Sequence, residues 1–325
     1  MYKIKHKPEY FIVKEISNVK LMDKGEFAVF LLKKTNYNTI DVIKRIANFL
    51  KIKQRQIGYG GNKDKVAITE QYISVPNRLK DKLNKFELKD VELKFVGYTN
   101  ESLFLGDLIG NKFEIVISDL SEDKVNQFIA KYGEQDKIKI INYFGEQRFS
   151  RNNSDIGKAL VKGNFKLALE LIGDTNNGLS KEFKSYLDKN KNDYVGALKL
   201  VPDKLLKLFV HAYQSFMWNY VVKIFIDDNV VSKLKNINIP LLGFGSEIHD
   251  ELNTIYSEIM SKESISQRDF IIKALPHLSQ EGAERDLFVF AEDFKILEQA
   301  NEKIKVCFKL KKGSYATEVV RQVLE

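Results

Sequence analysis

The residues that could do chemistry in this chain gather in the glycine-rich stretch 58–71, which reads GYGGNKDKVAITEQ. Three glycines in its first four positions allow a sharp turn and let a ligand approach the backbone closely. They lead to a lone carboxylate, Asp64, between Lys63 and Lys65. Nearby positive charge favours the ionised form of an acid, so Asp64 could serve as a nucleophile or as a base. Local composition alone is explained equally well by a surface turn with solvated charges.

Known nucleotide-binding motifs do not fit these glycines. A phosphate-binding P-loop requires glycine, lysine and then serine or threonine in succession, whereas Gly61 is followed by Asn62 and Lys63 by Asp64. A dinucleotide-binding loop would need a third glycine where Lys63 stands. The segment 62–65 resembles a guanine-reading Asn-Lys-x-Asp loop, but its acid comes one residue too early. No second carboxylate at helical spacing accompanies Asp64, so paired acid and base catalysis is not indicated either.

The segment 142–149 is a second candidate, because a predicted strand over 137–141 runs directly into Asn142, Tyr143 and Phe144. An amide can read the Watson–Crick edge of a splayed-out base while an aromatic ring stacks on its face. Arg148 could add a phosphate contact. Taken alone, however, the segment favours burial of its rings as ordinary core.

Whole-chain composition narrows the function classes. The 325 residues are 44% hydrophobic, enough for a sizeable core, and a net charge of +8 suggests a polyanionic partner, although lysine-rich surfaces also serve solubility. The single cysteine, Cys307, excludes an internal disulfide, and the four histidines lack metal-ligand spacing, so metal-independent chemistry is predicted. The first residues lack the apolar segment of a secretory signal, and no apolar run approaches the ~20 residues of a membrane span. These features predict a cytoplasmic protein.

Periodic patterns predict the elements that must position these residues. Strands are predicted over 8–16, 27–32, 71–75, 90–98, 111–118 and 137–141, with a helix over 39–50 capped by Thr39 and another beginning at Ser121. Helical patterns predominate from about residue 151, over 155–172, 181–187, 204–225 and after 251. Strands return over 287–291 and 304–310, before a short helix over 316–324. The change from strand patterns to helical patterns, and the return to strand patterns near the end, predict a second, helix-rich unit.

Six segments in sequence order resemble the TruD family of tRNA pseudouridine synthases, and the likeness covers nearly the whole chain. The family signature Gly-x-Lys-Asp-x-x-Ala-x-Thr-x-Gln stands here as Gly61, Lys63, Asp64, Ala67, Thr69 and Gln71. The other segments are Pro8-Glu9-x-Phe11, residues 34–39 with Asn38-Thr39, Gly110-Asn-x-Phe113, Asn142-Tyr-Phe-Gly-x-Gln-Arg-Phe149 and Gly313-Ser-Tyr-Ala-Thr-x-Val-Val-Arg321. Two positions depart from the family pattern: Tyr10, where many relatives have an acid, and Tyr315, where bacterial relatives often have phenylalanine.

The resemblance implies an enzyme that converts a specific uridine of tRNA to pseudouridine, with base flipping and with neither a cofactor nor a metal. Other RNA substrates stay open, and neither an obligate protein partner nor a membrane is implied. Asp64 matches the essential aspartate, which attacks the sugar or the base or removes a proton from C2′. The implied substrate-binding residues are Lys5, Phe11, Asn142, Phe144 and Tyr315, together with Lys63, which shapes the loop or contacts phosphate.

The implied fold class is α/β (α+β), with a pseudouridine-synthase catalytic domain built on a mixed, largely antiparallel sheet with flanking helices. This domain would comprise residues 1–152 and 283–325, interrupted by a helix-rich TruD-specific insertion at 153–282. Two rival hypotheses remain open. One is an RNA-binding or RNA-remodelling protein in which Asp64 is only a loop residue, and the other is a nucleotide-binding enzyme.

Overall fold

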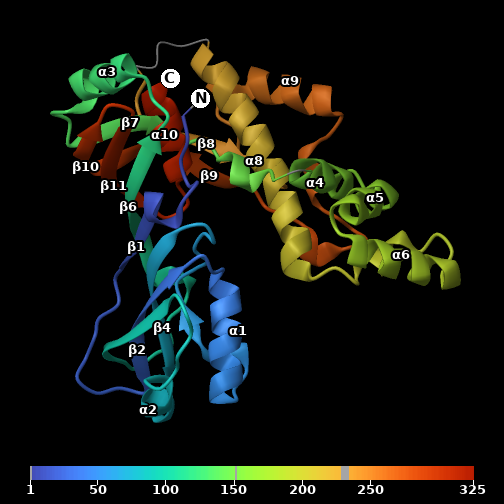
Figure 1. The fold of residues 1–325 in the computed structure, drawn as a ribbon. Helices are drawn as coiled ribbons and strands as arrows, with labels where there is room; N and C mark the ends of the chain where they lie inside the picture. Colours follow the sequence, from blue (N-terminus) through green and yellow to red (C-terminus); the bar gives the residue numbers. More distant parts are fainter. Residues whose placement is uncertain (1, 151, 228–233) are drawn as a thin grey trace. The chain divides into compact units, whose positions relative to one another are not determined.

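The computed structural model describes residues 2–150, 152–227 and 234–325, and the chain divides into two compact units (Figure 1). The sheet unit comprises Met1–Ile140 and Val289–Glu325, and the helical unit comprises Ile141–Phe288. Both domain boundaries expected from the sequence, 152/153 and 282/283, fall inside the helical unit. Its assignment as the TruD-specific insertion stays a prediction.

The sheet unit is built on a mixed sheet that has nine strands in the described part of the chain. Its strands are β1 (Phe11–Ser17), β2 (Phe27–Thr35), β3 (Gly58–Tyr59), β4 (Ile68–Pro76), β5 (Val91–Thr99), β6 (Leu108–Ser118), β7 (Lys137–Ile141), β10 (Phe288–Ala300) and β11 (Lys303–Lys311). They follow the order β5-β2-β4-β1-β6-β11-β10-β7, with β3 paired to β4. Strand β1 runs parallel to β4 and antiparallel to β6, and β2, β3 and β11 pair antiparallel with their neighbours. The expected mixed, largely antiparallel sheet is confirmed.

Helices cover the two halves of this sheet. Helix α1 (Thr39–Leu50) and the short α2 (Lys80–Leu83) bury their apolar residues against β2 and β4, and Figure 1 shows α1 running alongside these strands. Helices α3 (Glu122–Tyr132) and α10 (Ala316–Leu324) pack on the other half, over β6, β10 and β11. Because strand side chains alternate between faces, one set of residues on each strand forms these cores.

The N-cap of helix α1 lies one residue earlier than expected. Its N-cap is Asn38, whose side-chain amide donates to the Asp41 carboxylate (3.1 Å), and Thr39 is the first helical residue. The prediction that Thr39 caps the helix is therefore wrong. The Thr39 hydroxyl is free to bond outside the helix, and it contacts the loop that carries Asp64's neighbour Lys63.

The helical unit contains α4 (Asn153–Val161), α5 (Phe165–Thr175), α6 (Asn177–Lys189), α7 (Tyr194–Leu198), α8 (Asp203–Asp227) and α9 (Asn253–Glu263), with an antiparallel pair β8 (Asn238–Leu241) and β9 (Ala283–Asp286). A single helix predicted over 155–172 is wrong, because the chain turns at Gly163 (φ +69°) and separates α4 from α5. Glycine adopts this left-handed conformation without steric cost. Within the described residues, no helix is both long and apolar enough to span a membrane.

Candidate active site

The loop between β3 and β4 presents the Asp64 carboxylate to solvent and binds it to one lysine. The Lys5 ammonium donates to Asp64 Oδ2 at 2.6 Å, and the Asp64 side chain keeps 39% of its surface exposed. The same ammonium lies 4.0 Å from the centroid of the Phe11 ring, a cation–π contact. Phe11 is itself 2% exposed. The structure thus brings together three residues predicted from sequence, with the carboxylate the most accessible of them.

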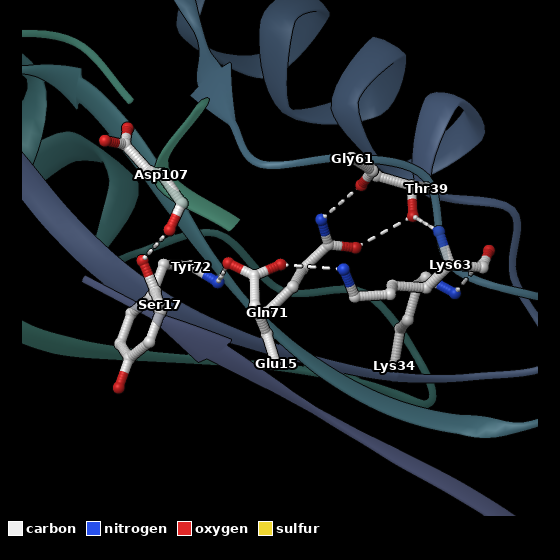
Figure 2. A network of polar contacts seen from close by, with 9 residues as sticks. All are labelled: Glu15, Ser17, Lys34, Thr39, Gly61, Lys63, Gln71, Tyr72 and Asp107. Atoms are coloured by element: carbon white, nitrogen blue, oxygen red, sulfur yellow. Dashed lines mark hydrogen bonds and ion pairs between the residues drawn. The ribbon is translucent and has the colours of Figure 1, made fainter. Parts of the chain in front are cut away.

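Strand β1 carries two of the supports for this loop on one face. Phe11 and Glu15 are an even number of residues apart, so their side chains point to the same side of the strand. Glu15 Oε2 accepts from the Lys63 ammonium at 2.7 Å, and the two side chains are only 2% and 4% exposed (Figure 2). Buried charges are stable only when paired. This ion pair supports the loop-shaping role for Lys63, since a phosphate contact would require the pair to open.

Lys34 holds the backbone of the loop from within the protein. Its ammonium donates to the carbonyl oxygens of Tyr37 (2.6 Å), Asp64 (3.0 Å) and Lys63 (3.5 Å). The side chain is fully buried. Burial lowers the pKa of Lys34 to about 8, the charge of Asp64 opposes this shift, and that of Lys63 adds to it. Lys34 therefore fixes the main chain of Asp64 while Lys5 holds its side chain.

Sequence reasoning missed the role of Lys34, although a signal was present. The expected strand stopped at residue 32, whereas β2 extends to Thr35. On β2, every second residue from Ala28 to Leu32 points to the same buried face, and Lys34 occupies the next position on that face. When the alternating pattern of a strand predicts that a lysine is buried, that lysine is a candidate for a hydrogen-bonded internal charge.

Two further signature residues, Gly61 and Gln71, connect the loop to α1 and β4. The Gln71 amide donates to the Gly61 carbonyl (2.9 Å) and accepts from the Thr39 hydroxyl (2.8 Å), which in turn accepts from the Lys63 backbone N–H (3.0 Å). Figure 2 shows this chain of bonds beside the Glu15–Lys63 pair. Gly61 has a φ of +153°, a backbone conformation that favours glycine. The spacing of Gly61, Lys63 and Gln71 in the signature is thus explained by contacts that hold the loop in place.

Tyr315 belongs to the sheet unit and is the N-cap residue of α10. Its carbonyl accepts from the backbone N–H groups of Glu318 (3.1 Å) and Val319 (3.3 Å), which ties it to the first turn. The side chain is half-buried. The departure from phenylalanine at this position therefore places a hydroxyl on a ring that solvent can partly reach.

Asn142 and Phe144 lie in the helical unit, where Arg285 of β9 contacts both. Arg285 Nε donates to the Asn142 carbonyl (2.9 Å) and Nη2 donates to the side-chain Oδ1 (2.7 Å). The guanidinium carbon lies 3.9 Å from the centroid of the Phe144 ring. Asn142 Nδ2 donates to the Asp286 carbonyl (3.1 Å), so the orientation of its amide is set. The sequence offers no signal for Arg285, because 143 positions separate it from Asn142.

Phe144 has a second support from helix α8. The Asn219 side chain accepts from the Phe144 backbone N–H and donates to its carbonyl, both at 2.9 Å. The Phe144 ring meets Trp218 edge-on, with ring centroids 5.6 Å apart. The sequence pattern predicted a helix here, over 204–225, but gave no signal for Asn219, because its partner Phe144 lies 75 positions away in the chain. Among the residues that the structure describes, no three histidine, cysteine or acidic side chains come together as metal ligands.

Comparison with known proteins decides the family. The model of the family described as tRNA pseudouridine synthase D (TruD) matches residues 2–185, 174–235 and 226–323. The chain belongs to the TruD family. The resemblance noted from the sequence signature is therefore confirmed, and the chain is an enzyme of the TruD type.

TruD relatives align along almost their entire length. The tRNA pseudouridine synthase D of Aquifex aeolicus is 27% identical, with 99% of this chain and 97% of the relative covered. The "Probable tRNA pseudouridine synthase D" of Thermococcus onnurineus is 29% identical, with coverages of 99% and 94%. A crystal structure assigned to TruD from Methanosarcina mazei superposes with a TM-score of 0.70 at 26% identity, covering 99% of this chain and 93% of that one. The expected fold class is thereby confirmed.

Proposed function

We propose that this chain isomerises a uridine of tRNA to pseudouridine, with Asp64 as the essential carboxylate, a flipped target base and no cofactor. The observation that carries the proposal is the Asp64 carboxylate itself. The Asp64 side chain is 39% exposed. The buried Lys34 fixes the backbone of Asp64, and Lys5 holds its carboxylate. In a chain of the TruD family, a reactive group that is both accessible and preorganised is what this chemistry requires.

The reaction balances without a redox partner. The bond from N1 of uracil to C1′ breaks, a bond from C5 to C1′ forms, C5 loses its proton and N1 gains one. Asp64 can open this sequence by attacking C1′, by adding to the base, or by removing a proton from C2′. All three routes start from the same ionised carboxylate.

Lys5 and Phe11 act through Asp64 in this proposal. The Lys5 ammonium, 2.6 Å from Oδ2, orients the carboxylate and balances its charge. The Phe11 ring stabilises that ammonium by a cation–π contact, with Lys5 Nζ 4.0 Å from the ring centroid. Because the Phe11 ring is 2% exposed, this support is favoured over direct stacking of Phe11 on a base.

Asn142 and Phe144 are proposed to receive the flipped base. An amide and a ring provide edge recognition and stacking, and these contacts offset the few kcal/mol that unstacking costs. Both residues are held in advance, Asn142 by Arg285 and Phe144 by Arg285 and Asn219. Preorganisation of this kind limits the entropy lost on binding.

The test is Asp64→Asn, which keeps the size of the side chain and removes its charge. We expect normal folding and tRNA binding but no release of tritium from tRNA labelled at C5 of uridine. Asp81→Asn, at an exposed aspartate of α2, is the matched control and should retain turnover. Normal turnover by Asp64→Asn would refute the assignment. Binding of tRNA by the wild type without any tritium release would favour the RNA-binding rival.

A further inference from the structure

A groove beside the Asp64 loop has a lining suited to a polyanion. It has a volume of about 510 Å³, within the range of about 300–1,000 Å³ found for ligand sites. It lies wholly in the sheet unit, between helix α1, the turn that precedes the helix and the residue that follows Asp64. Its lining residues are Asn36, Tyr37, Asp41, Lys44, Arg45, Asn48 and Lys65.

The charge of the groove is mainly positive and is not neutralised internally. Lys44, Arg45 and Lys65 are exposed, and within the described part of the chain none of them has an ion-pair partner. The acid in the lining, Asp41, instead accepts from the Asn38 amide at 3.1 Å. Neighbouring lysines outside the groove do find carboxylates, as Lys33 does with Glu92 at 3.1 Å. Unpaired cations gathered in a groove attract polyanions.

The walls of the groove are fixed before any ligand arrives. Asn36 takes the left-handed conformation (φ 61°) and its N–H donates to the Ala67 carbonyl at 3.3 Å. The Tyr37 carbonyl is held by buried Lys34 (2.6 Å), and the Tyr37 ring packs on the core under α1. The Arg45 guanidinium lies 6.0 Å from the centroid of that ring. The groove thus combines an aromatic face, cations and amides on a rigid frame.

We propose that this groove binds the phosphate backbone of the single-stranded RNA segment next to the target uridine. The inference rests on the proposed function. Lys65 follows Asp64 directly, so their Cα atoms are about 3.8 Å apart and a strand whose uridine reaches Asp64 continues at the groove. Lysine and arginine bind phosphates, asparagine amides bind phosphate and sugar oxygens, and an aromatic face accepts a base without sequence preference.

The experiment measures binding of fluorescein-labelled unfractionated tRNA by anisotropy over a range of KCl concentrations. The groove variant carries Lys44→Gln, Arg45→Gln and Lys65→Gln. The control variant removes the same charge from exposed lysines of the sheet unit outside the groove, as Lys24→Gln, Lys85→Gln and Lys89→Gln. Each phosphate contact to a single strand contributes about 0.7 to the slope of log Kd against log salt, so losing three lowers the slope by about 2.

We expect the groove variant to bind at least tenfold more weakly than the wild type at moderate salt, with that fall in slope, while the control stays within about twofold. Equal losses in the two variants would overturn the proposal, because they would show a diffuse charge effect. Unchanged tRNA binding by the groove variant would also overturn it and would point to a different occupant, such as an acidic protein segment. The assay measures binding and not turnover, so it tests the role of the groove separately from the role of Asp64.

Discussion

Replacing Lys34 with methionine is the sharpest test of how the Asp64 loop is held. Methionine keeps the length and the apolar stem of lysine but removes the ammonium that bonds the carbonyl oxygens of Tyr37 (2.6 Å) and Asp64 (3.0 Å). The loop backbone then loses these hydrogen bonds to the protein interior, while the Lys5 contact to the Asp64 carboxylate remains. We expect turnover to fall at least ~100-fold, because misplacement of a reacting group by about 1 Å costs that much.

The expected change in stability is the difference between two opposing effects. Hydrogen bonds to a charged group contribute about 1.5–3 kcal/mol each, so the loss of two costs about 3–6 kcal/mol. The substitution also removes the penalty for burying a charge. A fall in the Lys34 pKa from 10.5 to about 8, at about 1.36 kcal/mol per pKa unit, corresponds to roughly 3.4 kcal/mol. The two effects largely offset, leaving a destabilisation of about 0–3 kcal/mol at neutral pH.

The same burial makes the stability of the wild type depend on pH. The pKa of Lys34 is about 8 in the folded protein and 10.5 in the unfolded chain, so between these values the unfolded chain binds more protons. The free energy of unfolding therefore rises with pH across this window. The penalty is fully present below pH 8 and disappears above pH 10.5. Relative to Lys34→Met, the wild type should gain up to about 3 kcal/mol between these limits.

Urea unfolding at pH 7 to 10.5 measures this difference, and tritium release measures turnover. Lys33→Met is the matched control, since Lys33 precedes Lys34 on the opposite face of β2 and makes an exposed ion pair with Glu92. Its stability should change by less than ~1 kcal/mol and its turnover should stay normal. Normal turnover by Lys34→Met, or a stability difference that does not change with pH, would refute the reasoning.

Two further predictions concern residues that hold the site. Glu15→Gln should destabilise the protein by about 3–5 kcal/mol in urea unfolding, because it leaves the buried Lys63 ammonium unpaired, and the double variant Glu15→Met with Lys63→Met should recover much of this loss without weakening tRNA binding. A loss of tRNA affinity in that double variant would instead support a phosphate contact by Lys63. Arg285→Gln should lower turnover at least tenfold by releasing Asn142, while the fluorescence of Trp218, the single tryptophan, keeps its buried emission maximum. A red-shifted maximum would show that the helical unit has lost its packing, and unchanged turnover would exclude Arg285 as a positioning residue.

The sequence predicted most elements because their signals are local. Period-two alternation marks strands such as β6 and β7, and apolar residues at helical spacing, from Ile40 to Leu50, mark α1. Alternation shows which side of an element is buried, whatever covers it. The errors came where a local rule competes with a tertiary one. Thr39 is a residue type that often caps helices, but its hydroxyl bonds to the Asp64 loop instead. Gly163 ends a helix although the apolar pattern continues beyond it.

The sequence by itself determined the family, the fold class and the choice of Asp64, because ordered motifs and a lone acid can be read without coordinates. Only the tertiary structure decided how that acid is held, since Lys5 lies 59 positions from Asp64 and Glu15 lies 48 from Lys63. It likewise decided how the Asn142 amide is held in the helical unit, since Arg285 lies 143 positions from Asn142. The physical reason is that a buried polar group must find its partner in space. Which partner it finds depends on strand order and register, and these are set by the packing of the whole sheet rather than by neighbours in the chain.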